Sequence, residues 1–322
     1  MATYKSTKGL SVEVLAADPT TDDTVGLLYL NTTDNEFKYV RPGGLANGTW
    51  ASGGNINTPR KGLSGFGTQT AAIAATGNTP PNTVNVESYN GSSWTEVNNV
   101  NTGKFYRGNC GTAAAGLIIG GSPENADVEE WDGTSWTETA NYPASRSQII
   151  QIGTQTAAFC IGGSPITTAT NTYNGSAFTS STAINTGRGA GVGAGTTTAG
   201  VIAGGTTGSA VNNTEVWDGS SWTEVNNLNT ARDLFAGSGS SSTAMIAFGG
   251  LASALAVTES WNGTSWTEIG DLATGRRELG GSSNGTSELA LAFSGCSSPG
   301  QVLANTEEWS APDVLIKVVA DS

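Results

Sequence analysis

Short stretches of alternating apolar and polar residues, separated by turns rich in glycine, asparagine and serine, fill most of the chain. One pattern recurs: an aromatic residue, then Asn-Gly or Asp-Gly, two small polar residues and a second aromatic residue. The clearest copy runs from Trp131 to Glu138. Both central residues of such a tight turn are expected to have positive φ angles, which Asn-Gly and Asp-Gly allow, so each copy predicts two antiparallel strands joined by such a turn.

The second aromatic residue recurs at spacings of 42, 42, 44 and 44 residues, at Trp94, Trp136, Phe178, Trp222 and Trp266. A fixed period of this size is typical of a solenoid, a propeller or an array. Each repeat predicts four strands: a glycine-rich first strand, an apolar second strand, a third strand with Glu-x-Trp or Glu-x-Tyr, and a fourth with Trp-Thr-Glu. The third-strand glutamates are Glu87, Glu129, Glu215, Glu259 and Glu307.

The third repeat departs from this pattern. It carries Asn171 in place of the glutamate and Phe178 in place of the second tryptophan. We therefore expect the loosest packing in this repeat.

Half of the repeated motif stands at each end of the repeat region. Asn47-Gly48-Thr49-Trp50 matches the fourth strand, and Asn305 to Trp309 matches the third. We expect the strand of Trp50 to pair with the strand of Trp309 and so to close an all-β, six-bladed β-propeller, which leaves no free sheet edge. The tryptophans predicted to have a structural role in this packing are Trp50, Trp94, Trp131, Trp136, Trp217, Trp222, Trp261, Trp266 and Trp309.

The segments outside the repeat predict two further parts. Residues 1–44 contain a β-hairpin, residues 26–30 and 36–40, and form an N-terminal module for attachment or oligomerisation. An isolated hairpin is marginally stable, so this module should dock on something else. The propeller then covers residues 45–310, and residues 311–322 form a strand-like tail.

The repeat resembles kelch repeats. The shared features are a diglycine that closes the second strand, an aromatic residue followed by Asp or Asn, a downstream tryptophan and an arginine before the first strand. Thr76-Gly77 and Ser294-Gly295 replace the diglycine in the first and last repeats. The motif Asn-Gly-Ser-Ser-Trp-Thr-Glu, with its small polar spacers, resembles repeats in kelch-like proteins of tailed phages, particularly marine ones. The N-terminal hairpin resembles segments of phage fibre proteins.

Composition excludes several classes of function. The net charge of -13 argues against nucleic-acid binding. The chain has no histidine, which argues against histidine-based metal or acid–base sites, and neighbouring carboxylates such as Glu129 and Glu130 alternate across a strand rather than facing one bond. We expect the three cysteines to be small buried side chains. We expect no enzyme activity, metal or cofactor; no signal peptide or membrane span is predicted, so synthesis is expected in a cytoplasm.

One basic residue recurs at the same repeat position: Arg60, Lys104, Arg146, Arg188, Arg232 and Arg276. By ring symmetry these residues should surround one mouth of the central channel. They could capture anionic groups of a glycan or lipid, or each could pair with a third-strand glutamate. Pairing is favoured, because the repeat requires the same contact in every blade.

The connections between the second and third strands vary from repeat to repeat. Two of them contain apolar residues that a plain loop does not need, namely Leu251, Leu255, Val302 and Leu303. Because strands alternate in direction, these connections share one face with the basic residues, whereas the chain enters and leaves the ring on the other face. Loops on a rigid scaffold are the usual place for binding.

The resemblance implies a phage virion structural protein, a tail or head fibre that binds a host-surface glycan or protein. The N-terminal module would then bind other virion proteins, and a homo-oligomer is possible. Two alternatives remain: a purely structural virion decoration, and a non-viral kelch adaptor that binds another protein.

Overall fold

The computed structural model describes residues 12–20, 24, 26–251, 253–298, 301–312 and 314–318. The chain divides into two units, which we call the propeller-like unit (Thr49–Ser310) and the terminal unit (Met1–Gly48 with Ala311–Ser322). Both are built from β-strands; the described residues contain no α-helix, and a 3₁₀ turn spans Leu45–Asn47. No described helix has the length and hydropathy to span a membrane.

Four-stranded antiparallel sheets make up the propeller-like unit, and in most of them four consecutive strands are paired in chain order. The first sheet holds β5 (Ser64–Thr68), β6 (Ala71–Ala75), β7 (Val86–Tyr89) and β8 (Trp94–Val97). The second holds β9 (Gly108–Thr112), β10 (Ala115–Ile119), β11 (Val128–Trp131) and β12 (Trp136–Glu138). The third holds β13 (Ile150–Thr154), β14 (Ala157–Ile161), β15 (Thr170–Tyr173) and β16 (Phe178–Ser181).

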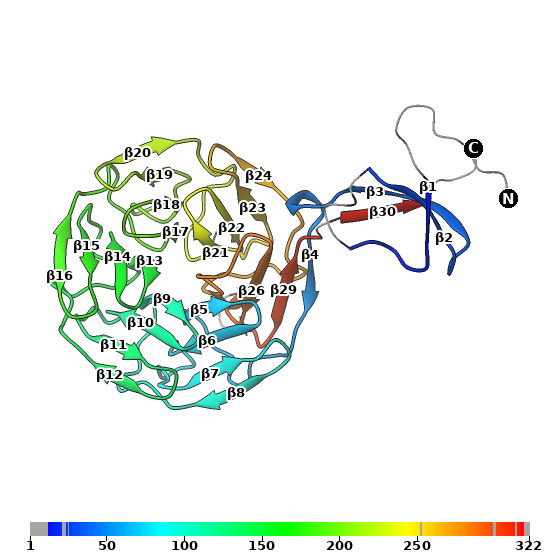
Figure 1. Ribbon diagram of the computed structural model, residues 1–322. Helices are drawn as coiled ribbons and strands as arrows, with labels where there is room; N and C mark the ends of the chain where they lie inside the picture. The colour runs from blue at the N-terminus through cyan, green and yellow to red at the C-terminus, as the bar shows by residue number, and fades with distance from the viewer. Residues whose placement is uncertain are drawn as a thin grey trace. The chain divides into compact units, whose positions relative to one another are not determined.

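The fourth sheet holds β17 (Val192–Gly195), β18 (Gly200–Ala203), β19 (Thr214–Trp217) and β20 (Trp222–Val225). The fifth holds β21 (Ala236–Ser241), β22 (Ala244–Phe248), β23 (Thr258–Trp261) and β24 (Trp266–Glu268). Figure 1 shows these sheets set around a common centre, with first strands such as β9 and β13 near the centre and fourth strands such as β12 and β16 at the rim. The arrangement is that of a β-propeller-like fold.

One sheet combines strands from both ends of the unit, and we call it the split sheet. Its order is β25 (Gly280–Gly281), β26 (Leu289–Phe293), β29 (Thr306–Ser310) and β4 (Thr49–Ser52). Trp309 lies opposite Trp50 in the antiparallel β29–β4 pair, so the expected pairing of these two strands is present. A two-stranded hairpin, β27 (Cys296–Ser298) and β28 (Gln301–Val302), lies between β26 and β29 in sequence.

The core lies between neighbouring sheets. In one cluster, Phe66 and Ile73 of the first sheet pack with Ile118, Trp131 and Trp136 of the second. The second strands are buried on both faces because a sheet covers each side of them. This explains why these strands are apolar throughout instead of alternating.

Asparagine or aspartate closes each turn between a third and a fourth strand. Asn90 Oδ1 accepts hydrogen bonds from the backbone N–H groups of Ser92 and Ser93. Asp132, Asn174, Asp218 and Asn262 do the same in their sheets. The prediction that both central residues have positive φ was wrong: the turn has four residues, and its only positive φ belongs to the glycine, such as Gly91.

The terminal unit is one four-stranded sheet in the order β1 (Val12–Leu15), β2 (Leu28–Asn31), β3 (Glu36–Pro42) and β30 (Val314–Val318). The predicted N-terminal hairpin is β2 and β3. The predicted C-terminal tail is not a separate part, because β30 pairs with β3 and completes the same sheet. Residues 1–11 of the predicted N-terminal module and residues 319–322 of the predicted tail lie outside the described residues.

Candidate functional site

The recurrent basic position is mostly buried. Arg60, Arg188, Arg232 and Arg276 are each 0% exposed. Each pairs with the third-strand glutamate of its own sheet: Glu87, Glu215, Glu259 and Glu307. The expected pairing with glutamate is therefore confirmed for these four residues. The alternative, a ring of arginines that captures an anion, is wrong for them because no solvent reaches their guanidinium groups.

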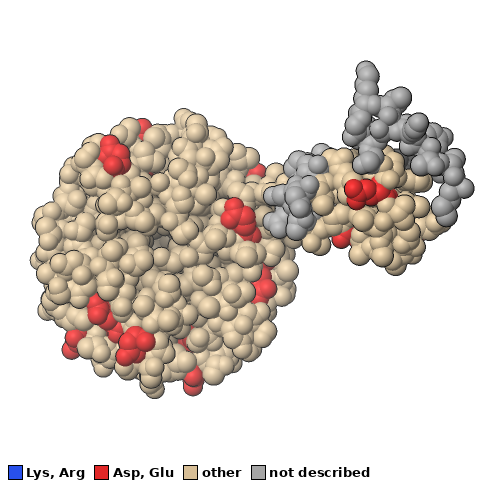
Figure 2. Space-filling view, in the orientation of Figure 1, with Lys and Arg blue, Asp and Glu red and all other residues tan. Residues whose placement is uncertain are grey.

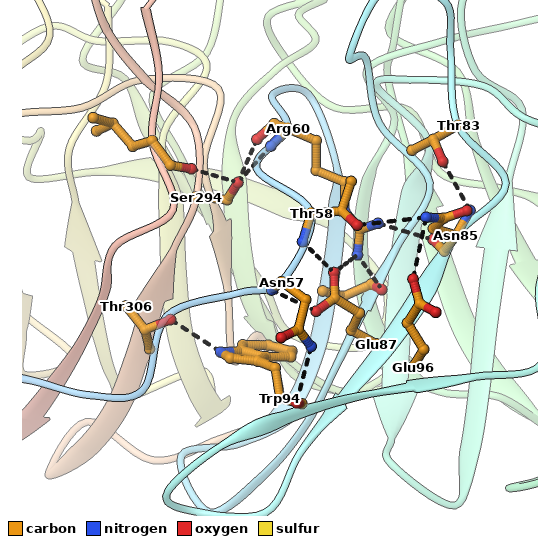
Figure 3. Close-up of polar contacts among 12 residues, drawn as sticks. Asn57, Thr58, Arg60, Thr83, Asn85, Glu87, Trp94, Glu96, Ser294 and Thr306 are labelled. Atoms are coloured by element: carbon orange, nitrogen blue, oxygen red, sulfur yellow. Dashed lines mark hydrogen bonds and ion pairs between the residues drawn. The ribbon is translucent and has the colours of Figure 1, made fainter.

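The first sheet shows how this pair is held (Figure 3). Arg60 Nη2 lies 3.3 Å from Glu87 Oε1. The backbone N–H groups of Asn57 and Thr58 donate to the same carboxylate over 2.7 and 3.1 Å. The glutamate thus fastens the incoming connection, which explains why Asn-Thr precedes the arginine. Equivalent backbone bonds reach Glu129, Glu215, Glu259 and Glu307.

Lys104 and Arg146 do not follow this rule. In the second sheet Arg107, three residues after Lys104, takes the buried place and lies 2.7 Å from Glu129. Lys104 Nζ instead donates to the Pro123 carbonyl over 3.5 Å, and Arg146 Nη1 donates to the Pro165 carbonyl over 2.7 Å. Both side chains are half-buried. The prediction of one equivalent position is therefore wrong for these two residues.

The third sheet replaces the ion pair by a neutral one. Tyr142 Oη donates to Asn171 Oδ1 over 3.0 Å, and both side chains are buried. Phe178 in this sheet is only partly buried, like Trp50 of the split sheet, whereas Trp94, Trp136, Trp222 and Trp266 are buried. Partial burial at this position therefore does not distinguish the third repeat from the split sheet.

Burial changes the acidity of the paired arginines. It lowers the pKa of Arg60 to about 10, and the nearby Glu87 carboxylate opposes that shift. Burial also lowers the pKa of Arg107, Arg188, Arg232 and Arg276. The pKa of Arg60 stays well above neutrality, so it keeps its charge at pH 7 and remains a true ion pair.

Most of the predicted structural tryptophans form tilted ring pairs within a sheet. Trp131 and Trp136 have ring centroids 5.3 Å apart, and the pairs Trp217–Trp222, Trp261–Trp266 and Trp50–Trp309 are similar. Trp94 pairs with Tyr89. All of these tryptophans are buried except Trp50, which is half-buried. They are packing residues rather than an exposed platform.

Tryptophans of the fourth strands also link neighbouring sheets. The indole N–H of Trp94 donates to Thr306 Oγ1, that of Trp266 to Thr214 and that of Trp50 to Thr258. Each threonine begins the third strand of the preceding sheet. Trp136 faces Val86 at that position, and its buried indole N–H has no hydrogen-bond partner.

We expect Val86→Thr to raise the free energy of unfolding by about 1 kcal/mol, because the new hydroxyl gives the Trp136 N–H the acceptor that it lacks. Chemical denaturation followed by tryptophan fluorescence measures the change. Val128→Thr is the matched control: its neighbour Phe178 has no donor, so burying a hydroxyl there should lower stability by about 1–2 kcal/mol. Equal effects of the two substitutions would contradict the role given to Trp136.

The apolar loop residues differ in exposure. Leu251, Leu255 and Val302 are half-buried. Leu303 is 9% exposed, and its backbone N–H donates to the Gly295 carbonyl. The expectation that Leu303 is offered for binding is therefore wrong, because its side chain is buried.

The connections between strands lie at the two opposite ends of the strands. The first-to-second and third-to-fourth turns lie at one of these ends, which we call the hairpin edge: Thr68 faces Ala71 there, and Tyr89 faces Trp94. The other connections lie at the opposite loop edge. Ser310 pairs with both Leu289 and Thr49, which places the two ends of the propeller-like unit at the hairpin edge.

A closed chain of backbone hydrogen bonds surrounds the centre at the loop edge. We call its members the axial ring: Gly62, Tyr106, Gln148, Ala190, Leu234 and Glu278. The N–H of each donates to the carbonyl of the preceding member over 2.7–3.0 Å, and Gly62 donates to Glu278, so the bonds return to their start. Every member has a positive φ, from 51° to 62°. Non-glycine residues rarely adopt this conformation, so its presence here marks a special position.

Sequence reasoning missed the axial ring. Its members share a backbone conformation but no side-chain type. Each lies two residues after the recurrent basic residue of its repeat, at a position where the residue type differs from repeat to repeat. This variation at a fixed position is the only sign of the axial ring in the sequence.

Asn284 forms a cross-link near the centre at the hairpin edge. Its Nδ2 donates to the Gly153 carbonyl over 2.7 Å, and its Oδ1 accepts from Gly111 N–H over 2.9 Å. Asn284 belongs to the turn of the split sheet, whereas Gly111 and Gly153 belong to the second and third sheets. This one amide therefore ties together sheets that are not neighbours in sequence.

The described residues offer no group of three or more His, Cys, Asp or Glu side chains that could hold a metal ion. The three cysteines are free and buried, as expected for small core side chains. No protein-family model matches the chain, and a search of curated proteins finds no match. Function must therefore be inferred from geometry and from the resemblance of the repeat.

Proposed function

We propose that the chain is a closed six-bladed kelch-like β-propeller of a phage virion, a fibre protein that displays the loop edge for binding to a host-surface glycan or protein. We further propose that it has no catalytic role. The resemblance of the repeat to kelch-like phage proteins supplies the biological setting.

Contacts around the centre support a closed ring of six blades. Successive first strands contact one another from β5 through β9, β13, β17 and β21 to β25, and β25 contacts β5. The axial ring has one member from each sheet. The β29–β4 pair joins the two ends of the unit in one sheet.

The separation of the variable positions from the chain ends is the observation that carries the display function. The half-buried cations Lys61, Lys104, Arg146 and Arg277 all lie in connections at the loop edge. The ends of the unit, Thr49 and Ser310, lie at the hairpin edge. Figure 2 shows a face with acidic side chains at several places and, among the residues that it colours, no Lys or Arg.

The terminal unit has a surface suited to attachment. Val12 and Val14 of β1 are 46% and 66% exposed, and Phe37 of β3 is 50% exposed. Pairing places them on one face, because Val14 lies opposite Leu30 and Leu30 opposite Phe37. Exposed apolar patches of this kind mark protein interfaces. We propose that another virion protein covers this face.

Two sets of substitutions test the division of labour. Val14→Asp with Phe37→Asp should abolish incorporation into particles and leave cell binding intact, because a charge cannot be buried in an apolar interface without a large cost. Leu251→Ser, Leu255→Ser and Val302→Ser together should abolish binding of the purified protein to host cells and leave incorporation intact. Incorporation is read from purified particles and binding from fluorescently labelled protein. The reverse pattern, in which the terminal-unit variant loses cell binding and the loop variant keeps it, would refute the assignment and place the receptor site on the terminal unit.

A further inference from the structure

A cavity of about 130 Å³ lies among the first strands at the centre of the propeller-like unit. All six members of the axial ring line it at the loop edge, and it extends to Ser283, next to the Asn284 cross-link. Its walls combine apolar side chains such as Phe235 and Leu279 with the polar side chains of Gln151 and Glu278. Concave sites with apolar walls and a few convergent polar groups are typical of small-molecule sites.

Two buried acceptor side chains, Gln151 and Glu278, line this cavity, and each is 7% exposed. Gln151 Oε1 has no hydrogen-bond partner, and Glu278 Oε2 accepts no hydrogen bond, although it forms an ion pair with Lys61. A buried acceptor without a donor is costly, and ordinary cores avoid it. A ligand that donates hydrogen bonds would satisfy both atoms.

The charges near Glu278 decide what kind of donor fits. Lys61 Nζ lies 3.4 Å from Glu278 Oε2, and Arg277 Nε lies 3.9 Å from Oε1. These cations would repel an ammonium ligand, and the Glu278 carboxylate would repel an anion. A neutral ligand with hydroxyl donors meets neither penalty.

Tyr106 gives the cavity an aromatic wall at its mouth. Its ring lies 4.6 Å, centroid to centroid, from the ring of Phe105. A side chain at Gly62 would clash with the Tyr106 ring, its Cβ coming within 2.9 Å, so glycine is needed for the ring to lie there. Burial, together with a hydrogen bond to Glu278, raises the pKa of Tyr106. An aromatic face beside a carboxylate and an amide suits the apolar face and the hydroxyls of a sugar ring.

We propose that the central cavity binds a single neutral sugar residue, whose hydroxyls donate to Gln151 Oε1 and Glu278 Oε2 and whose ring packs against Tyr106. The hydrogen-bonded axial ring fixes the backbone of Tyr106 and Glu278, and strand β13 fixes that of Gln151, before the ligand arrives, which lowers the entropic cost of binding. The inference rests on the proposed display function only for its biological role, and it names the ligand class for that function.

The test uses the full-length protein and a panel of monosaccharides: glucose, galactose, mannose and N-acetylglucosamine as neutral probes, glucosamine as a cation and N-acetylneuraminic acid as an anion. Saturation-transfer NMR and calorimetric titration measure binding. We expect at least one neutral sugar to bind and both charged sugars to bind at least tenfold more weakly. Gln151→Leu and Glu278→Gln should each weaken binding by about tenfold or more.

Gln69→Leu is the matched control. Gln69 is also a buried glutamine, but it donates to the Ala290 and Trp309 carbonyls and does not line the cavity. Its replacement should leave sugar affinity unchanged, and thermal unfolding checks that all variants are folded. Absence of binding by every neutral sugar at millimolar concentration, or binding that Gln151→Leu and Glu278→Gln do not weaken, would overturn the inference. Cell binding that persists in that case would leave the display function standing, whereas sugar binding without cell binding would refute display alone.

Discussion

Arg232→Met should lower the free energy of unfolding by about 3–5 kcal/mol, because it leaves the Glu259 carboxylate buried without its countercharge. Glu259 is 0% exposed, and Arg232 Nη2 lies 2.7 Å from its Oε1. Equilibrium denaturation followed by tryptophan fluorescence measures the loss. Arg146→Met is the control, since Arg146 is half-buried and has no glutamate partner among the described residues; its effect should stay within about 0.5 kcal/mol.

A double variant separates charge from packing. Arg232→Met with Glu259→Gln removes both charges and keeps an oxygen that can accept from the backbone N–H of Asn229. We expect it to be more stable than Arg232→Met alone, as the neutral Tyr142–Asn171 pair of the third sheet indicates. If Arg232→Met were no more destabilising than Arg146→Met, the buried ion pairs would not contribute to stability.

A chain that ends at Ala304 should fail to form a soluble, cooperatively folded protein. This truncation removes β29, so β26 and β4 lose the strand between them. Ala290, Leu291 and Phe293 of β26 are 0% exposed in the intact protein and would become a free apolar edge. Unpaired apolar edges promote aggregation.

A chain that ends at Pro312 is the matched control, because it removes β30 and keeps the split sheet intact. We expect this chain to remain soluble and to keep the melting transition of the propeller-like unit. Trp309→Ala gives a graded form of the first truncation and should cost about 3–5 kcal/mol. Size-exclusion chromatography and thermal unfolding decide the matter; equal behaviour of the two truncated chains would show that β29 is dispensable.

Local repetition made much of the fold predictable from the sequence. The aromatic pairs around Asn-Gly and Asp-Gly located the outer hairpins, and the two half-motifs predicted the Trp50–Trp309 pair. The pairing of arginine with glutamate could be predicted because both recur with the same period.

Contacts that do not recur with the repeat could not be predicted. Arg107 occupies the buried place of the second sheet although Lys104 matches the sequence pattern, because side chains from either position can approach Glu129. Asn284 contacts Gly111 and Gly153, which belong to distant repeats, and the residues around Asn284 in sequence give no sign of these contacts. The candidate sugar site combines Gln151 of a first strand with Tyr106 and Glu278 of the axial ring, which come from three different repeats, and so the sequence shows no motif for it.

The split sheet also sets the order of events during translation. β4 leaves the ribosome early, but its partner β29 is made only after all the other strands of the propeller-like unit. The early strand must therefore wait while the repeats between them fold, since domains form as their segments emerge. A nascent chain that stalls before Thr306 lacks β29 and leaves β26 and β4 without the strand that lies between them.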